Sequence, residues 1–250
     1  MILSEQKQKY LVPLLQGKKL GAFAVTEPSA GSDLGNQKTT AVDKGDYWLL
    51  NGSKIFITNG FYADTYFVTA VTDKTQRSRG ISAFIVEKGT PGFTFGTKEK
   101  KMGIRGSATY ELVFQDCKVP KENLLGELGK GFKMALITLD GGRIGVAAQA
   151  LGIAQSAIDH CKKYVTEHMQ GEQRISQYQF TQFELADMGK LYAAEAATNV
   201  TRRCLQLAGY DGYSRDFPFE RLMRDAKITE IYEGTSEVQR MVISSWMGVK

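Results

Sequence analysis

A carboxylate stands directly before a glycine and two hydroxyl residues in the segment YEGTS at 232–236. The apolar spacing that follows predicts a helix at 235–247, which Thr235 or Ser236 can cap. Glu233 is then expected at a loop-to-helix junction, where backbone N–H groups point outward and a general base can be held in a cleft. A solvated turn carboxylate is the plainer interpretation, because functional carboxylates are a minority. The local pattern leaves both interpretations open.

Two further segments combine glycine with hydroxyl groups. The segment TEPSAGSD at 26–33 ends an apolar strand, and Thr26 and Ser32 offer hydroxyls beside a glycine that lets the backbone approach a ligand. The segment FITNG at 56–60 adds an aromatic ring and a third hydroxyl. Neither has the glycine spacing of a Rossmann motif. A plain β-turn at 26–33 and a core position for Phe56 are the alternatives.

The segment LDGGRI at 139–144 carries a charged pair, Asp140 and Arg143, three residues apart. On a helix surface such a pair contributes only a few tenths of a kcal/mol, about 0.2–0.5. The two glycines between its members lower helix propensity by roughly 1 kcal/mol each, so we expect them to interrupt the helix. That interruption indicates close approach of another group.

Composition excludes several classes of function. The chain has 250 residues and a net charge of +5, with a pI near 8.9, and its short basic blocks are typical of solvated faces and not of nucleic-acid tracks. Three widely spaced cysteines indicate a reducing compartment, and the two histidines form no metal-ligand cluster, so we expect no metal. We also expect no membrane span and no signal peptide before Ser4.

The elements that must position these residues change character along the chain. Residues 4–16 read as one amphipathic helix capped by Ser4, with Tyr10, Leu11, Leu14 and Leu15 on a common face. Strands are predicted at 66–71, 81–86 and 111–114, and residues 47–60 predict a hairpin whose turn is Asn51-Gly52. Helical periodicity then predicts helices at about 133–170, 177–208, 218–227 and 235–247.

These elements predict an α+β fold, an antiparallel β barrel or sandwich followed by a helical bundle, because no helices separate the strands. The expected divisions are an N-terminal helical segment at 1–19, a β domain at 20–125 and a helical bundle at 126–250.

The segments described above together resemble the acyl-CoA dehydrogenase family, and most of all its short-chain, butyryl-CoA branch. The resemblance runs from Ser4 to Met247 and includes KMGIR at 101–105 and MRDAK at 223–227. It implies an FAD-dependent oxidoreductase of fatty acid metabolism that binds CoA, removes the α-proton of a short-chain acyl-CoA and transfers the β-hydride to flavin. An acyl-CoA oxidase-like enzyme, which differs in oxygen access, stays an open alternative.

The resemblance also implies roles for individual residues. Glu233 is the expected general base, and its backbone N–H and a ribityl hydroxyl are the expected donors to the thioester oxygen. The expected FAD contacts, between the β domain and the bundle, are Phe23, Thr26, Ser32, Phe56, Ile57, Thr58, His168, Gln179, Gln206, Gly209, Tyr210, Thr235 and Glu237. The expected substrate contacts are Ser32, Asp140, Arg143 and Gly234.

The expected partners are an electron-transfer flavoprotein, which reoxidises the flavin, and further copies of the chain in a homodimer or homotetramer. The expected compartment is the cytoplasm in a bacterium or the mitochondrial matrix in a eukaryote. Residues 1–19 would be a remnant of the family's N-terminal helical domain.

The chain departs from the family pattern at four places. Most of the N-terminal helical domain has no counterpart, and residues 183–188 run directly into 189–195, where the family has a helix end, a loop and a helix start. His168 stands where the family has an arginine that faces the neighbouring subunit's FAD, and Tyr210 replaces a glycine. These departures favour the alternative of a catalytically impaired, truncated paralogue or fragment that folds and oligomerises without catalysis.

Overall fold

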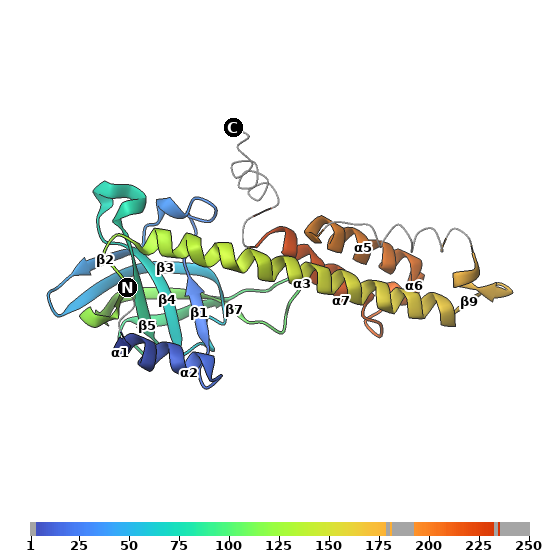
Figure 1. Ribbon diagram of the computed structural model, residues 1–250, viewed down its shortest axis with the longest axis horizontal. Helices are drawn as coiled ribbons and strands as arrows, with labels where there is room; N and C mark the ends of the chain where they lie inside the picture. Colours follow the sequence, from blue (N-terminus) through green and yellow to red (C-terminus); the bar gives the residue numbers. More distant parts are fainter. Residues whose placement is uncertain (1–3, 179–180, 182–192, 233–234, 236–250) are drawn as a thin grey trace. The chain divides into compact units, whose positions relative to one another are not determined.

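The computed structural model describes residues 4–178, 181, 193–232 and 235, and it divides into two compact units (Figure 1). The first, the β unit, comprises Met1–Lys100 and Arg105–Thr138. The second, the helical unit, comprises Lys101–Ile104 and Leu139–Lys250.

The β unit is built on one sheet of eight strands within its described residues. The strands are β1 (Gly21–Ala24), β2 (Thr40–Asp43), β3 (Tyr47–Thr58), β4 (Thr65–Val71), β5 (Ile81–Glu87), β6 (Phe93–Lys98), β7 (Thr109–Pro120) and β8 (Leu124–Leu125). They follow the order β6-β7-β3-β2-β4-β5-β8, and β1 pairs with β4. The pairs of β4 with β1 and β2 are parallel and the others antiparallel. The predicted strands at 66–71, 81–86 and 111–114 are confirmed, in a sheet that is mixed and mostly antiparallel.

Burial on both faces explains the continuous apolar run at 83–86 in β5. Successive side chains of a strand point to opposite faces. Phe84 and Val86 pack in the main core with Trp48 and Leu112, whereas Ala83 and Ile85 pack against Tyr10 and Leu125. Strands that are buried on both sides read as continuous runs of apolar residues.

The second face of β5 is covered by the N-terminal helix, which consists of α1 (Ser4–Gln6), the π-helical η1 (Lys7–Leu11) and α2 (Val12–Leu15). Tyr10 is buried there, and its hydroxyl lies within hydrogen-bond distance of Glu87 Oε1 and Asn123 Oδ1, at 2.8 and 2.9 Å. The helix at 4–16 is thus confirmed, but the predicted apolar face is wrong because Leu11 and Leu15 are exposed. The wider π-helical turn shifts residues away from the α-helical spacing on which that face depended.

The predicted hairpin turn at Asn51-Gly52 is also wrong, because β3 continues through both residues. A register shift opposite β7 lies between Leu50 and Gly52, and Gly52 has φ +145°. The Asn51 amide donates to Asp116 Oδ1 at 3.1 Å, and Asn51 Oδ1 accepts from the Asp116 backbone N–H at 2.8 Å. A Cβ at residue 52 would lie 2.6 Å from Thr39 Cα. The glycine therefore serves a β-bulge and a close approach of backbone, not a turn.

The helical unit packs three helices around small side chains: α3 (Gly131–Glu167), most of which belongs to this unit, α5 (Ala193–Leu207) and α7 (Phe219–Lys227). On α3 the buried residues Ala150, Ala154, Ala157, Cys161 and Val165 recur every three or four positions. They meet Ala197, Val200 and Cys204 of α5 and Phe219, Leu222 and Ala226 of α7. The described residues of the unit also form β9 (Met169–Gln170), β10 (Gln173–Arg174), η5 (Ile175–Gln177), α6 (Gly209–Tyr213) and η6 (Ile228–Glu230).

The helix predictions have mixed outcomes. The helix at 218–227 is confirmed as α7, and that at 133–170 as α3, which ends at Glu167. The expected interruption by Gly141 and Gly142 is wrong, since α3 continues through them. Glycine lowers helix propensity but keeps its N–H donor, so long helical flanks can offset it. Of the helix predicted at 177–208, Ala193–Leu207 is helical, while 182–192 and most of the helix at 235–247 lie outside the described residues.

Within the described residues, no helix is long and apolar enough to cross a membrane.

Candidate functional site

Phe56 is the most unusual of the predicted site residues. It has φ +59°, in the left-handed region that residues with bulky side chains rarely adopt, and the residue is 59% exposed. It lies where β3 shifts register against β7, between Lys54 and Ile57. A strained backbone and an exposed aromatic ring each make folding less favourable, and such features are concentrated at ligand sites.

The backbone of the predicted segment 26–33 is tied to this bulge. Thr26 follows β1, and its carbonyl oxygen accepts a hydrogen bond from the Ile55 N–H at 2.9 Å. On the other end of β1, the Asn59 amide donates to Gly21 O at 3.4 Å. The structure therefore brings together the segments at 26–33 and 56–60, which the sequence analysis singled out separately. Thr26 lies beside Ile55, the residue before Phe56.

The remaining predicted residues of the β unit differ in what they can offer a ligand. Thr58 is exposed at the end of β3, and Ser32 is exposed beyond a turn closed by two backbone hydrogen bonds of 3.1 Å between Glu27 and Ala30. Phe23 is half-buried and stacks on Phe67 with ring centroids 4.9 Å apart. Ile57 is 2% exposed and packs in the main core, so only its peptide group is available to a ligand.

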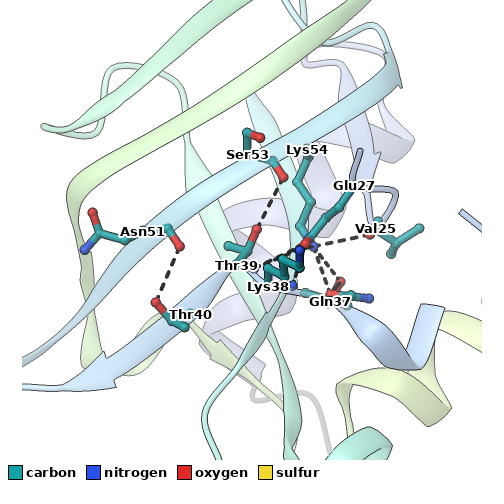
Figure 2. Close-up of polar contacts among 10 residues, drawn as sticks. Val25, Glu27, Gln37, Lys38, Thr39, Thr40, Asn51, Ser53 and Lys54 are labelled. Atoms are coloured by element: carbon teal, nitrogen blue, oxygen red, sulfur yellow. Dashed lines mark hydrogen bonds and ion pairs between the residues drawn. The ribbon is translucent and has the colours of Figure 1, made fainter. Parts of the chain in front are cut away.

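Sequence analysis missed the residue that connects these segments, Lys54. Its side chain is fully buried, and Figure 2 shows it pointing toward Glu27, Gln37 and Val25. The ammonium donates to Glu27 Oε1 at 2.7 Å and to Gln37 Oε1 at 2.9 Å. The sequence contained a signal for this residue. Lys54 stands at an inward-facing position of β3, and the inward-facing residues before it, Trp48 and Leu50, are apolar.

Burial and mutual attraction act in opposite directions on the ionisation of Lys54 and Glu27. Burial lowers the pKa of the Lys54 ammonium from 10.5 to about 8, although attraction to Glu27 and their hydrogen bond act in the opposite direction. Burial would raise the pKa of Glu27, but attraction to Lys54 and hydrogen bonds from Lys54 and from the Lys38 and Thr39 residues leave that pKa below its ordinary value. Removing one partner of such a buried pair costs about 3–5 kcal/mol.

An open cavity of about 490 Å³ in the β unit lies among other residues. Its walls are formed by Thr40, Ala41, Val42, Asp43, Trp48, Val71, Thr72, Lys74 and Leu128. None of the residues predicted to contact flavin or substrate lines it, so its size alone does not place the site there.

In the helical unit, Asp140 and Arg143 pair with each other on α3, as their spacing predicted. The Arg143 guanidinium donates to Asp140 Oδ1, and the arginine side chain is 22% exposed whereas the aspartate side chain is 59% exposed. The pair presents one carboxylate to solvent beside a positive charge.

His168 lies just beyond the end of α3. Its ring stacks on Tyr164 with centroids 3.8 Å apart, and its Nε2 is 4.0 Å from Asp211 Oδ2. The Tyr164 hydroxyl lies within hydrogen-bond distance of two acceptors, Asp211 Oδ2 at 3.1 Å and Ala208 O at 3.2 Å. The neighbouring predicted residues, Gln206, Gly209 and Tyr210, are all exposed.

The segments KMGIR and MRDAK, which sequence analysis noted separately, also meet. The Ile104 N–H donates to Asp225 Oδ1 at 2.6 Å, and Arg224 Nη1 donates to Met102 O at 2.8 Å. Arg224 pairs in addition with Glu220, four residues earlier, at 2.6 and 2.8 Å. These bonds hold the segment Lys101–Ile104 against α7, the helix that precedes the predicted base, Glu233.

Four predicted site residues, Gln179, Glu233, Gly234 and Glu237, lie outside the described residues, and Thr235 is half-buried.

Comparison with known proteins finds a match over most of the chain. The model of the acyl-CoA dehydrogenase middle domain matches residues 22–117. The model of the acyl-CoA dehydrogenase C-terminal domain matches twice, at 129–189 and 186–248.

Two relatives illustrate the similarity in sequence. The short-chain-specific acyl-CoA dehydrogenase of Clostridium acetobutylicum is 51% identical over 270 aligned residues, which cover 96% of this chain and 71% of the relative. The mitochondrial short-chain-specific acyl-CoA dehydrogenase of Rattus norvegicus is 46% identical, with coverage of 96% and 66%. The alignment with the Clostridium protein is longer than this 250-residue chain, so at least 20 positions of the relative have no counterpart within it.

Solved structures show the same similarity. Butyryl-CoA dehydrogenase from Megasphaera elsdenii superposes with a TM-score of 0.95 at 50% identity, covering 98% of this chain and 72% of that one. A structure described as the electron transferring flavoprotein of Acidaminococcus fermentans gives a TM-score of 0.95 at 53% identity, with coverage of 98% and 72%.

Proposed function

This chain belongs to the acyl-CoA dehydrogenase family, and on that premise we propose that it catalyses the FAD-dependent α,β-dehydrogenation of a short-chain acyl-CoA thioester. The observation that carries the proposal is the likeness to short-chain-specific relatives, which extends over nearly the whole chain.

The residues around the β3 bulge fit a flavin. Phe56 offers an exposed aromatic face, and Thr26 and Thr58 offer hydroxyls on the two segments that meet there. An aromatic side chain beside hydrogen-bonding groups suits a flat ring system with a polar edge. When bound, FAD would accept the hydride that leaves the β-carbon of the substrate.

Glu233 is the proposed general base. An α-proton next to a thioester is too weakly acidic for a carboxylate in water, and desolvation raises the basicity of a carboxylate. Donors aimed at the thioester oxygen stabilise the enolate that develops as the proton leaves. The backbone N–H of Glu233 is one such donor in this proposal.

Substrate binding is assigned to charged and small residues. Arg143 is the proposed partner of the anionic CoA arm, and Asp140, its ion-pair partner, fixes the guanidinium in orientation. Ser32 and Gly234 are proposed to line the path of the pantetheine and the thioester.

An electron-transfer flavoprotein is the proposed electron acceptor, and a homodimer or homotetramer the proposed assembly. Because relatives are known from bacteria and from mitochondria, the proposed compartment is the bacterial cytoplasm or the mitochondrial matrix.

The test is anaerobic titration of purified protein with butyryl-CoA. Bound oxidised flavin should give a yellow protein, and butyryl-CoA should bleach the visible flavin band, whereas hexadecanoyl-CoA should do so far more slowly. A yellow protein that no acyl-CoA bleaches would contradict the proposal.

A second candidate is a catalytically impaired paralogue. It is favoured by the two overlapping matches of one domain model at 186–189 and by the positions of the relatives that have no counterpart here. His168 and Tyr210 stand where the family's flavin contacts are expected. In that case the protein should fold and self-associate, but the titration should show neither bound flavin nor bleaching.

A further inference from the structure

The Lys54 ammonium binds both neighbours of Thr26, the backbone of Val25 and the side chain of Glu27. It donates to Val25 O at 3.2 Å and to Glu27 Oε1 at 2.7 Å, so the residue before Thr26 and the residue after it share one donor. The next residue of β3, Ile55, donates its N–H to Thr26 O at 2.9 Å. Three consecutive contacts therefore set the position of Thr26 relative to β3.

The same ammonium and its carboxylate partner reach further around the segment. Lys54 also lies within hydrogen-bond distance of Gln37 Oε1, at 2.9 Å, and of Thr69 Oγ1 on β4, at 3.4 Å. The Glu27 carboxylate accepts from the Lys38 and Thr39 backbone N–H groups at 2.6 and 3.1 Å. An ammonium has three donors, so the four acceptors around it leave none of them unused.

Stability alone does not account for an ion pair at this position. A buried ion pair contributes little net stability, and well-packed apolar side chains of the same size often replace such a pair without loss. Lys54 is fully buried and pairs across the sheet with the buried Leu112 of β7, so an apolar side chain would suit its position. What an apolar residue could not do is bind Val25 O and Glu27 at the same time.

Lys54 is also two residues before Phe56 in β3, and Phe56 has a strained backbone conformation. The side chain of Lys54 fixes the Thr26 segment, and its main chain leads into the bulge that turns Phe56 outward. Strained residues persist only where their surroundings over-determine their conformation.

We propose that Lys54 is a positioning residue for the flavin, which holds the Thr26 and Phe56 segments at the spacing that bound FAD requires. The inference rests on the proposed function, because Thr26 and Phe56 are flavin contacts only under that proposal. Because Lys54 itself is fully buried, the proposed role is indirect.

A double variant separates positioning from stability. Lys54→Met alone leaves Glu27 charged and buried without its partner, so it should destabilise the fold strongly. The double variant Lys54→Met with Glu27→Gln removes both charges, keeps the approximate shapes and should recover most of the stability. The double variant would nevertheless lack the hydrogen bonds that the Lys54 ammonium makes to Val25 and residue 27.

The measurements are thermal unfolding, FAD affinity of the apoprotein and the visible circular dichroism of bound flavin. We expect the double variant to unfold near the wild-type temperature, to bind FAD about tenfold more weakly or worse, and to alter the flavin signal. Lys121→Met, which removes an exposed lysine paired with Asp43 in the same unit, should change none of these. Val119→Ala, which opens the core far from Thr26 in sequence, should lower stability without changing FAD affinity.

The outcomes distinguish this inference from the proposed function. A wild-type chain that binds no FAD would overturn the proposed function, and the inference with it. A wild-type chain that binds FAD, with a stable double variant of equal affinity and unchanged flavin signal, would overturn the inference alone. If Lys54→Met and the double variant both fail to fold, Lys54→Gln with Glu27→Gln provides the same comparison, because it removes the ammonium and leaves neither a buried charge nor an apolar group beside Gln37.

Discussion

His168 Nε2 lies 4.0 Å from Asp211 Oδ2, and the Tyr164 hydroxyl donates to the same carboxylate oxygen at 3.1 Å. Asp211 follows directly after Tyr210. Asp211 therefore connects the two positions at which sequence analysis expects a departure from the family pattern, since it lies beside His168 in space and beside Tyr210 in the chain.

Residue 168 provides the first prediction. His168→Arg should tighten FAD binding by about 1–2 kcal/mol, because a guanidinium supplies a fixed charge and a fork of donors that an imidazole lacks. Asp211 competes for that guanidinium, so Asp211→Asn should increase the gain. Fluorescence titration of apoprotein with FAD measures both effects. His160→Arg, on the exposed side of α3, is the matched control. Equal affinities in a confirmed dimer would mean that residue 168 faces no flavin.

Glu233 is tested by Glu233→Gln, which keeps the size and hydrogen bonding of the side chain but removes its basicity. Reduction of the flavin by butyryl-CoA should slow by at least about 10³-fold while binding of butyryl-CoA persists, since only proton removal is affected. Stopped-flow absorbance follows the reduction. Glu230→Gln, three residues earlier, removes a carboxylate that pairs with Lys227 and should leave the rate near that of the wild type. An unchanged rate in Glu233→Gln would refute the assignment of the base.

Phe56 should show a conflict between stability and binding. Phe56→Gly should raise the free energy of unfolding of the apoprotein by roughly 0.5–1 kcal/mol. Glycine relieves left-handed backbone strain of about 1–2 kcal/mol, and the higher entropy of glycine in the unfolded chain offsets part of that gain. The same change should weaken FAD binding. Arg77→Gly relieves similar strain, at φ +49° in an exposed segment, and should stabilise the protein without affecting FAD. Parallel loss of FAD in both variants would contradict a specific role for Phe56.

The lowered pKa of Lys54 predicts a stability difference at alkaline pH. Between about pH 8 and pH 10.5 the unfolded chain keeps a proton on Lys54 that the folded chain has released, so raising the pH favours the folded state. This stabilisation is complete above pH 10.5 and is lost as the pH falls to about 8. The free energy of unfolding of the wild type should therefore rise relative to that of Lys54→Met, by up to about 3 kcal/mol across the window.

Urea denaturation at a series of pH values measures that difference. Subtracting the Lys54→Met curve removes the contributions of the titrating groups that do not contact Lys54, and Lys121→Met serves as the control, since its lysine is exposed. Parallel curves for the wild type and Lys54→Met would mean that Lys54 keeps its proton throughout the window.

Gly103 tests the docking of Lys101–Ile104 on α7. A Cβ at residue 103 would lie 2.6 Å from the Arg224 carbonyl oxygen, whereas a Cβ at residue 106 would meet no atom within 4 Å. Gly103→Ala should lower the free energy of unfolding by about 1–3 kcal/mol, because backbone must move to admit the methyl group. Gly106→Ala should be neutral. Equal effects of the two changes would show that Gly103 is not packed against α7.

Local spacing in the sequence determined much of the fold. Runs of β-branched and aromatic residues identified β4 and β5, and apolar residues every three or four positions identified α3 and α7. Residue type also marked Phe56, Thr26, Asp140 and Arg143 as candidates, because an aromatic ring, a hydroxyl or an opposite charge at a given spacing is visible without a structure. These features depend on neighbours along the chain, which the sequence states directly.

Tertiary structure alone decided which distant segments meet. The pair of Glu27 and Lys54 joins residues 27 positions apart, and the contact of Ile104 with Asp225 spans 121 positions. It also decided that Asn51-Gly52 forms a bulge and not a turn, because Thr39 and Asp116 approach from other strands. Such contacts follow from how whole strands and helices bury their apolar faces together, and the energy of that packing is a sum over many residues that no single motif contains.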